Sequence, residues 1–170
     1  MQALARAWLV EADSTEGETR ESALENAETS IRTGLAYYPT LGNKPTAYYT
    51  PEVAYHSKLF YYSGELQKKR GISAKERLKS YRRAYEIKPD SPLNQMSLVK
   101  TYYELAQTAT TSEGQQSYAL AALDYFVEYA KATTRDPSQR SEYRTLLRTN
   151  FDRFPFLAER LHQLEEELFP

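Results

Sequence analysis

Two histidines and several carboxylates are the residues of this sequence that could act as acids, bases or metal ligands. His56 and His162 lie more than a hundred residues apart, whereas an imidazole acts as a general base only with a partner within hydrogen-bond reach. Glu159 and His162 have the spacing of a carboxylate-bridged di-iron helix. A second such pair would be needed, but Glu52 and His56 are four residues apart instead of three. We therefore expect no metal site, and we interpret Glu159 and His162 as part of a solvated helix face.

The composition excludes most other chemistry. The chain has 170 residues and no cysteine, which rules out disulfides, thiolate nucleophiles, zinc fingers and iron–sulfur clusters. Dinucleotide-binding, P-loop and nucleophile-elbow motifs are also absent from the sequence. With 41% hydrophobic and 26% charged residues, the chain has the composition of a folded, soluble protein. We predict that it is not an enzyme and needs no cofactor.

Helix-start signals divide the chain into eight helical segments, so the predicted class is all-α. Three starts pair a capping side chain with proline at the first helical position: Thr50-Pro51, Ser91-Pro92 and Asp136-Pro137. Three more place a hydroxyl three residues before a carboxylate, as a capping box requires: Thr15 with Glu18, Ser73 with Glu76 and Thr110 with Glu113. The predicted helices are 2–13, 16–38, 51–70, 74–88, 92–109, 113–133, 137–150 and 154–168.

One connection is longer than the others. It runs from Pro39 to Thr50, which exceeds most links between helices. We expect this segment to be mobile or functional.

The helices repeat in pairs. An offset of 41 residues places Pro51 on Pro92 and the pair Tyr61-Tyr62 on Tyr102-Tyr103, and a fixed period of this size is typical of a helical solenoid. The second helices share a spacing of small, large apolar and small residues before a proline. It is seen at Ala27, Ile31, Gly34 and Pro39, and its last three elements recur at Tyr81, Ala84 and Pro89. Over residues 16–134 this pattern resembles the second half of a tetratricopeptide repeat.

The resemblance implies a right-handed α-solenoid of four antiparallel helix pairs in a single domain, 1–170. The pairs would span about 1–38, 51–88, 92–133 and 137–168. First helices of this family line a groove that holds a peptide or a partner's helix, without chemistry of its own. The groove positions carried over here are Tyr55, His56, Leu59, Tyr62, Met96, Lys100 and Tyr103.

Two interpretations of these groove positions stay open. Tyrosine offers a large contact area and a hydroxyl that tolerates water, which suits recognition. A stripe of tyrosine and leucine at helical spacing is equally typical of a core. The sequence therefore predicts a protein-interaction module such as an adaptor, scaffold or assembly factor. The alternative is a helical bundle that binds a small ligand or metal between its helices.

Charge is distributed unevenly along the chain. Residues 67–88 carry a net charge of +7, whereas residues 1–36 carry -4 and the whole chain -1. We expect Lys75, Lys79, Arg82 and Arg83 to form an exposed basic patch, with Leu78, Tyr81 and Tyr85 pointing inward. The patch is either a solvated face, neutralised by acidic helices of the same or another copy, or a site for an acidic protein partner.

Other partners and the compartment are less constrained by the sequence. Nucleic acid is disfavoured because the net charge is slightly negative and the predicted inner helices carry no basic set. We expect no membrane span, since no apolar run reaches about 18 residues. The sequence is compatible with self-association, and with either a cytosolic protein or one whose leader has been removed.

Overall fold

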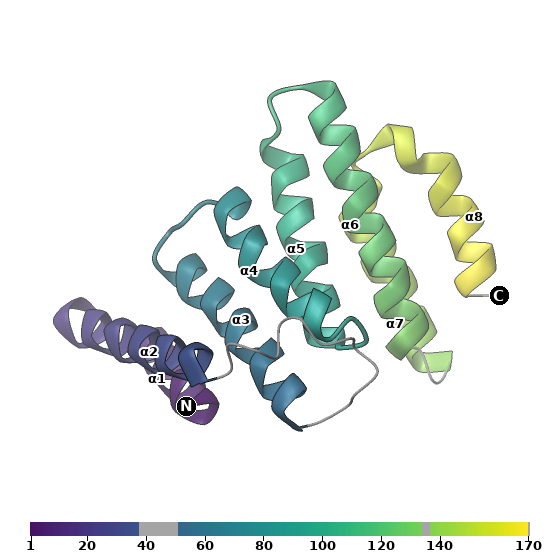
Figure 1. Ribbon diagram of the computed structural model, residues 1–170. Coiled ribbons are helices and arrows are strands. Elements are labelled where there is room, and N and C mark those ends of the chain that lie inside the picture. The colour runs from purple at the N-terminus through teal and green to yellow at the C-terminus, as the bar shows by residue number, and fades with distance from the viewer. Residues whose placement is uncertain (38–50, 134–136, 170) are drawn as a thin grey trace. The chain divides into compact units, whose positions relative to one another are not determined.

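The computed structural model describes residues 1–37, 51–133 and 137–169, and 88% of these residues are helical (Figure 1). None of the described residues lies in a strand, which confirms the all-α class. The elements within the described ranges are α1 Gln2–Ser14, α2 Gly17–Tyr37, α3 Pro51–Lys69, α4 Ala74–Ile87, α5 Pro92–Thr108, α6 Ser112–Thr133, α7 Pro137–Phe151, the 3-10 helix η2 Pro155–Leu157 and α8 Ala158–Leu168.

The first seven predicted helices agree with these bounds to within one residue. The eighth begins later than predicted, because residues 155–157 form a 3-10 turn in which the Leu157 amide donates to the Phe154 carbonyl at 2.9 Å. Among the described residues, none of the helices combines the length and apolarity needed to cross a bilayer.

One of the three predicted capping boxes is confirmed. The Ser73 hydroxyl accepts from the Glu76 amide at 3.4 Å and lies 2.7 Å from its carboxylate. The Thr15 prediction was wrong, because its hydroxyl donates to the Glu11 carbonyl at 2.8 Å and α2 begins at Gly17. The third cap lies one residue later than predicted.

That third cap is Thr111, whose hydroxyl accepts from the Gly114 amide at 3.1 Å; Thr110 was therefore the wrong residue. The predicted caps Thr50 and Asp136, and the connection 39–50, lie outside the described residues.

The chain divides into two compact units, Met1–Asn94 and Gln95–Pro170. The first, unit 1, holds the predicted pairs 1–38 and 51–88. The second, unit 2, holds the pairs 92–133 and 137–168 apart from the first residues of α5. Each unit has a core of its own.

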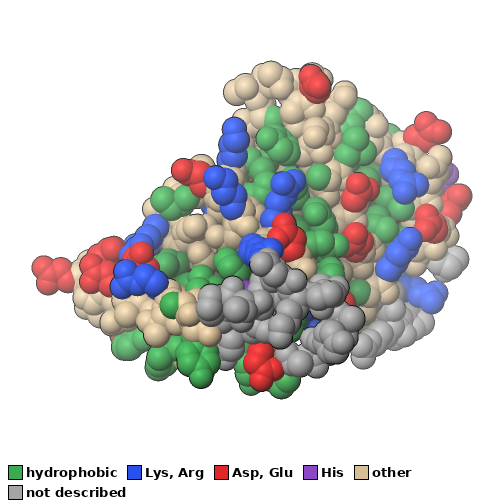
Figure 2. Space-filling model, in the orientation of Figure 1, with side chains coloured by type: hydrophobic (Ala, Val, Ile, Leu, Met, Phe, Trp, Pro, Cys, Tyr) green, Lys and Arg blue, Asp and Glu red, His purple; other side chains and the backbone are tan. Residues whose placement is uncertain are grey.

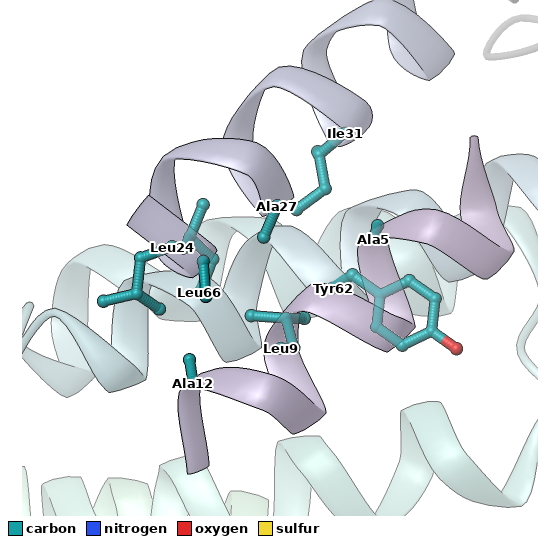
Figure 3. Packing of buried hydrophobic residues seen from close by; sticks show 9 residues of the cluster. Ala5, Leu9, Ala12, Leu24, Ala27, Ile31, Tyr62 and Leu66 are labelled. Atoms are coloured by element: carbon teal, nitrogen blue, oxygen red, sulfur yellow. The ribbon is translucent and has the colours of Figure 1, made fainter. Parts of the chain in front are cut away.

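The core of unit 1 forms where α1, α2 and α3 meet (Figure 3). Small and large apolar residues recur at intervals of three and four on each helix, so that each presents one apolar stripe. Full burial of one large apolar side chain contributes about 1.5–3 kcal/mol, so this cluster is a principal source of the unit's stability. Its buried members are Ala5, Leu9, Ala12, Ala23, Leu24, Ala27, Ile31, Tyr62 and Leu66.

Glycines set two of the helix approaches in unit 1. A Cβ atom at Gly34 of α2 would lie 2.7 Å from a methyl carbon of Leu59 on α3. A Cβ atom at Gly64 of α3 would lie 2.4 Å from the ring of Tyr81 on α4. Both distances are too short for carbon atoms in contact. Gly34 therefore serves the close approach that the small-residue spacing predicted, and Gly64 creates the space that Tyr81 fills.

Unit 2 has a core of leucine and phenylalanine. Phe126 of α6, Leu147 of α7 and Leu161 of α8 are at most 1% exposed. Leu157, Leu161 and Leu164 are also buried, and Leu168 is half-buried. Two arginines of α7 form hydrogen bonds with residues of α8 and the residue after it. Arg148 binds Glu165 through two hydrogen bonds of 2.6 and 2.5 Å, and Arg144 donates to the Phe169 carbonyl.

Candidate functional site

Unit 2 contains a pocket of about 400 Å³ that brings predicted groove residues together with residues of two other helices. We call it the α5 pocket. Its volume falls within the range of about 300–1,000 Å³ that is typical of ligand sites. The lining residues are Met96, Val99, Lys100 and Tyr103 of α5, Phe126 and Tyr129 of α6, and Leu146 and Asn150 of α7.

Helical spacing explains why the α5 residues share this pocket. Met96, Lys100 and Tyr103 follow each other at intervals of four and three residues, which places them on one face. The opposite face of α5 is anchored by Leu98 and Tyr102, which are 0% and 3% exposed, and Tyr102 stacks on Tyr125 of α6 with centroids 5.6 Å apart. Because the face with Leu98 and Tyr102 is buried, the opposite face, with Met96, Lys100 and Tyr103, is turned toward the pocket.

The α5 pocket has few polar side chains, and only some of them are held by hydrogen bonds. Lys100 is exposed and forms no hydrogen bond or ion pair with any described residue. Asn150 donates its side-chain amide to the Leu146 carbonyl at 2.7 Å. Burial raises the pKa of Tyr129 to about 12, and its hydroxyl is uncharged at neutral pH. The pocket therefore combines the positive charge of Lys100 with neutral aromatic and aliphatic side chains.

Tyr103 is held in place by a set of aromatic neighbours. Its ring lies edge-on to Phe151 and Phe154, with centroids 6.1 and 5.9 Å away. Its hydroxyl accepts a hydrogen bond of 3.2 Å from the Arg153 guanidinium. Because the ring also lines the α5 pocket, Tyr103 contributes both to packing and to the pocket surface.

The predicted groove positions of α3 lie mostly in the interior. His56, Leu59 and Tyr62 are 4%, 1% and 9% exposed, and Tyr62 belongs to the hydrophobic cluster of α1, α2 and α3. These three side chains cannot meet a partner without local opening, and at these positions the core interpretation fits the structure. Tyr55 is 46% exposed, and it remains accessible for contact.

Tyr55 and Leu59 line a second pocket, of about 520 Å³, in unit 1. The other lining residues come from α2 and from the first residues of the chain, and they include the largely exposed Tyr37. None of the eight lining residues has a charged side chain. This pocket therefore lacks the single fixed charge that distinguishes the α5 pocket.

The two histidines have different surroundings. Burial, together with the positive charge of Arg83, lowers the pKa of His56, so the ring is neutral at pH 7. His162 is exposed and lies 3.6 Å from the Glu166 carboxylate on the same helix. Over residues 1–37, 51–133 and 137–169, no three carboxylate or imidazole side chains cluster closely enough to hold a metal ion.

The basic segment 67–88 is neutralised only in part. At the end of α3, Lys69 pairs with Asp13 of α1, and Arg70 with Glu28 of α2 at 2.7 Å. On α4 the predicted basic patch is exposed at Lys75, Lys79 and Arg82 and half-buried at Arg83, which pairs with Glu86 at 2.9 Å. The inward residues lie as expected, with Tyr81 buried and Leu78 and Tyr85 half-buried. Pairing among the described residues thus accounts for some of these charges, whereas Lys75 and Lys79 form no ion pair within the described ranges.

Sequence reasoning missed two residues of the α5 pocket on α7. Counting from the starting proline, the groove positions Leu59 and Lys100 correspond on α7 to Thr145, whereas the next residue, Leu146, lines the pocket. The difference is one residue, or about 100° around a helix with 3.6 residues per turn. The apolar pattern of α7 holds the missing signal, because Tyr143 and Leu147 are buried and define the face beside which Leu146 and Asn150 must lie.

In the comparisons with known proteins, no family model, no curated protein and no solved structure matches the chain.

Proposed function

We propose that the protein is a non-catalytic interaction module, of the adaptor or scaffold kind, which binds a peptide segment or helix of a partner in the α5 pocket. The supporting observation is that Met96, Lys100 and Tyr103 share one pocket with aromatic and apolar residues of α6 and α7. A helical-repeat scaffold that presents first-helix side chains to a partner would use this set.

The chemistry of the α5 pocket indicates what kind of segment it binds. Met96, Tyr103 and Leu146, which are half-buried, offer apolar surface for one or two side chains of the ligand. The ammonium of Lys100, which no described residue engages, favours a carbonyl or carboxylate oxygen beside them. A segment with apolar residues next to an acidic or strongly polar one fits both requirements.

Selection from a random peptide library on the intact protein tests this proposal. Selected peptides are expected to combine apolar and acidic residues. Lys100→Glu should weaken their binding by about tenfold or more, which corresponds to the roughly 1.5–3 kcal/mol of a hydrogen bond to a charged group. Lys58→Glu makes the same charge change on an exposed lysine of α3 that has no partner among the described residues, and it should leave binding unchanged.

Two results would count against the proposal. Equal loss of binding in the Lys100 and Lys58 variants would reveal a general charge effect. Saturable binding of a small molecule that is lost in Leu146→Ala, without any selected peptide, would instead support the bundle that holds a small ligand between its helices.

A further inference from the structure

The outer face of α4 presents positive charge, and two of its lysines have no counter-ion among the described residues. Lys75, Lys79 and Arg82 follow each other at intervals of four and three residues, so they share one face, and all three are exposed. Lys75 and Lys79 form no ion pair or hydrogen bond with the described residues. The buried face of α4, which includes Tyr81 and Ala84, holds the helix in unit 1 and keeps the basic face outward.

The outer face of α2 presents the opposite charge. Glu18, Glu21 and Glu25 follow each other at intervals of three and four residues, and all are exposed. None of them forms an ion pair or hydrogen bond within the described ranges. Figure 2 shows acidic side chains gathered over the end of unit 1 that α1 and α2 form. The same unit therefore carries two exposed faces of opposite sign.

The two faces match in spacing when the helices run antiparallel. The intervals on α2 are those of α4 in reverse order, and each residue adds 1.5 Å along a helix axis. Glu18 then lies level with Arg82, Glu21 with Lys79 and Glu25 with Lys75. No ion pair joins the two sets within the part of the chain that the structure describes. The complement of each face is therefore available on a second copy of the chain.

We propose that the protein associates with itself head to tail, with the acidic face of α2 in one copy docked on the basic face of α4 in the next. The two faces differ, so the contact is heterologous and leaves one free face of each kind on the terminal copies. Growth then continues into a chain of copies or closes into a ring. Because the contact is formed by exposed charges, it is reversible and weakens as salt rises.

Sedimentation velocity of the full chain over a range of protein concentrations gives the first test. In buffer of about 20 mM ionic strength the average mass should rise with concentration, and in about 500 mM salt it should return to that of a single copy. A mass that stays at one copy at every concentration in low salt overturns the proposal. So does association that salt leaves unchanged.

Charge reversal on each face gives the second test. The variant Glu18→Lys/Glu21→Lys/Glu25→Lys carries two basic faces, and Lys75→Glu/Lys79→Glu/Arg82→Glu carries two acidic faces. Each should associate with itself at least about tenfold more weakly than the wild type, since three exposed pairs are lost and like charges face each other. An equimolar mixture of the two variants should associate again, because each supplies the face that the other lacks.

Two controls separate this contact from net charge and from misfolding. The variant Arg6→Glu/Lys58→Glu/Arg160→Glu changes the net charge by the same amount as the reversed α4 variant, at exposed positions outside both faces. Unlike the reversed α4 variant, it should still associate with itself. Reversing all six residues in one chain restores both faces and the wild-type net charge. If that chain folds by circular dichroism but stays a single copy, or if the mixture fails to associate, the proposal is wrong.

Discussion

The side-chain amide of Asn94 donates a hydrogen bond of 2.8 Å to the hydroxyl of Ser57, and both residues are at most 2% exposed. The same amide lies 3.0 Å from the carbonyl oxygens of Ala84 and Lys88, and the Ser57 hydroxyl donates to the Ala84 carbonyl at 2.9 Å. One asparagine thus adds side-chain hydrogen bonds to two carbonyls at the end of α4, each of which also accepts a backbone amide.

Replacing Asn94 should destabilise the protein in a graded way. Asn94→Ala removes the buried hydrogen bonds to Ser57 and to the Ala84 and Lys88 carbonyls, and it should lower the free energy of unfolding by about 1–3 kcal/mol. Asn94→Asp should cost more at pH 7, because a carboxylate would face those carbonyl oxygens. Denaturant titration measures both variants against Asn26→Ala, at an exposed position of α2. A harmless Asn94→Asp would show that this network contributes little.

The approach of α3 and α4 at Gly64 predicts a second effect on stability. Gly64→Ala would gain up to about 1 kcal/mol of helix propensity at an exposed site. Here its Cβ would meet the Tyr81 ring at 2.4 Å, and we expect a net loss of about 1–3 kcal/mol. Thermal unfolding measures the change. The double variant Gly64→Ala/Tyr81→Leu should lose less than the sum of the single variants, because the smaller side chain leaves room for the methyl group.

Alkaline pH should destabilise unit 1 through Tyr61. Burial, with the nearby charge of Glu65, raises the pKa of Tyr61 from 10.0 to about 12. The folded state therefore favours the neutral hydroxyl; this stabilisation is complete below about pH 10 and is lost as the pH rises toward 12. The free energy of unfolding should fall there by up to about 1 kcal/mol per pH unit for this residue.

The control for the alkaline effect is a phenylalanine. Tyr61→Phe should flatten the pH dependence between about pH 10 and 12, whereas Tyr37→Phe, at a side chain 79% exposed, should not. Tyr81 shifts in the same direction, because burial and the charge of Glu65 raise its pKa, so part of the slope should persist in the Tyr61 variant. An identical slope in Tyr61→Phe and wild type would contradict the prediction.

Acid pH should weaken the attachment of α8 to α7. Hydrogen bonds from Arg148 lower the pKa of Glu165 below its usual 4.5. The ion pair therefore stabilises the fold above about pH 4.5, and this contribution is lost as the pH falls through the lowered pKa. Glu165→Gln should lower stability by up to about 1 kcal/mol at pH 7. The difference from wild type should vanish in strong acid, while the exposed Glu159→Gln should show none at either pH.

Local sequence signals predicted most of the helices. The prolines at 51, 92 and 137 start helices where they were expected to, because a missing amide proton and a fixed backbone angle act within one turn. Thr15 and Thr110 failed as caps because neighbouring residues compete for the same bonds: Thr15 reaches back to the Glu11 carbonyl, and Thr111 takes the place of Thr110. A capping pattern identifies a turn more securely than it identifies the capping residue.

The sequence predicted the candidate site less well than the fold. Spacing placed Met96, Lys100 and Tyr103 on one face, but burial at His56, Leu59 and Tyr62 depends on which helices pack against α3. The same spacing therefore gave an open surface on α5 and an interior on α3. The role of Asn94 was not predicted, since its partners Ser57 and Ala84 lie 37 and 10 residues away.

The hydrogen bonds of Asn94 also set the shortest fragment in which the first unit can stand alone. A chain cut at the end of α4, after Ile87, would keep all of its helices yet lose two donors to the Ala84 carbonyl, the Asn94 side-chain amide and the Lys88 backbone amide. Such a fragment would fray from its carboxyl end and be open to proteases there. An expressible form of this unit must therefore extend through Asn94, several residues past the point at which its last complete helix ends.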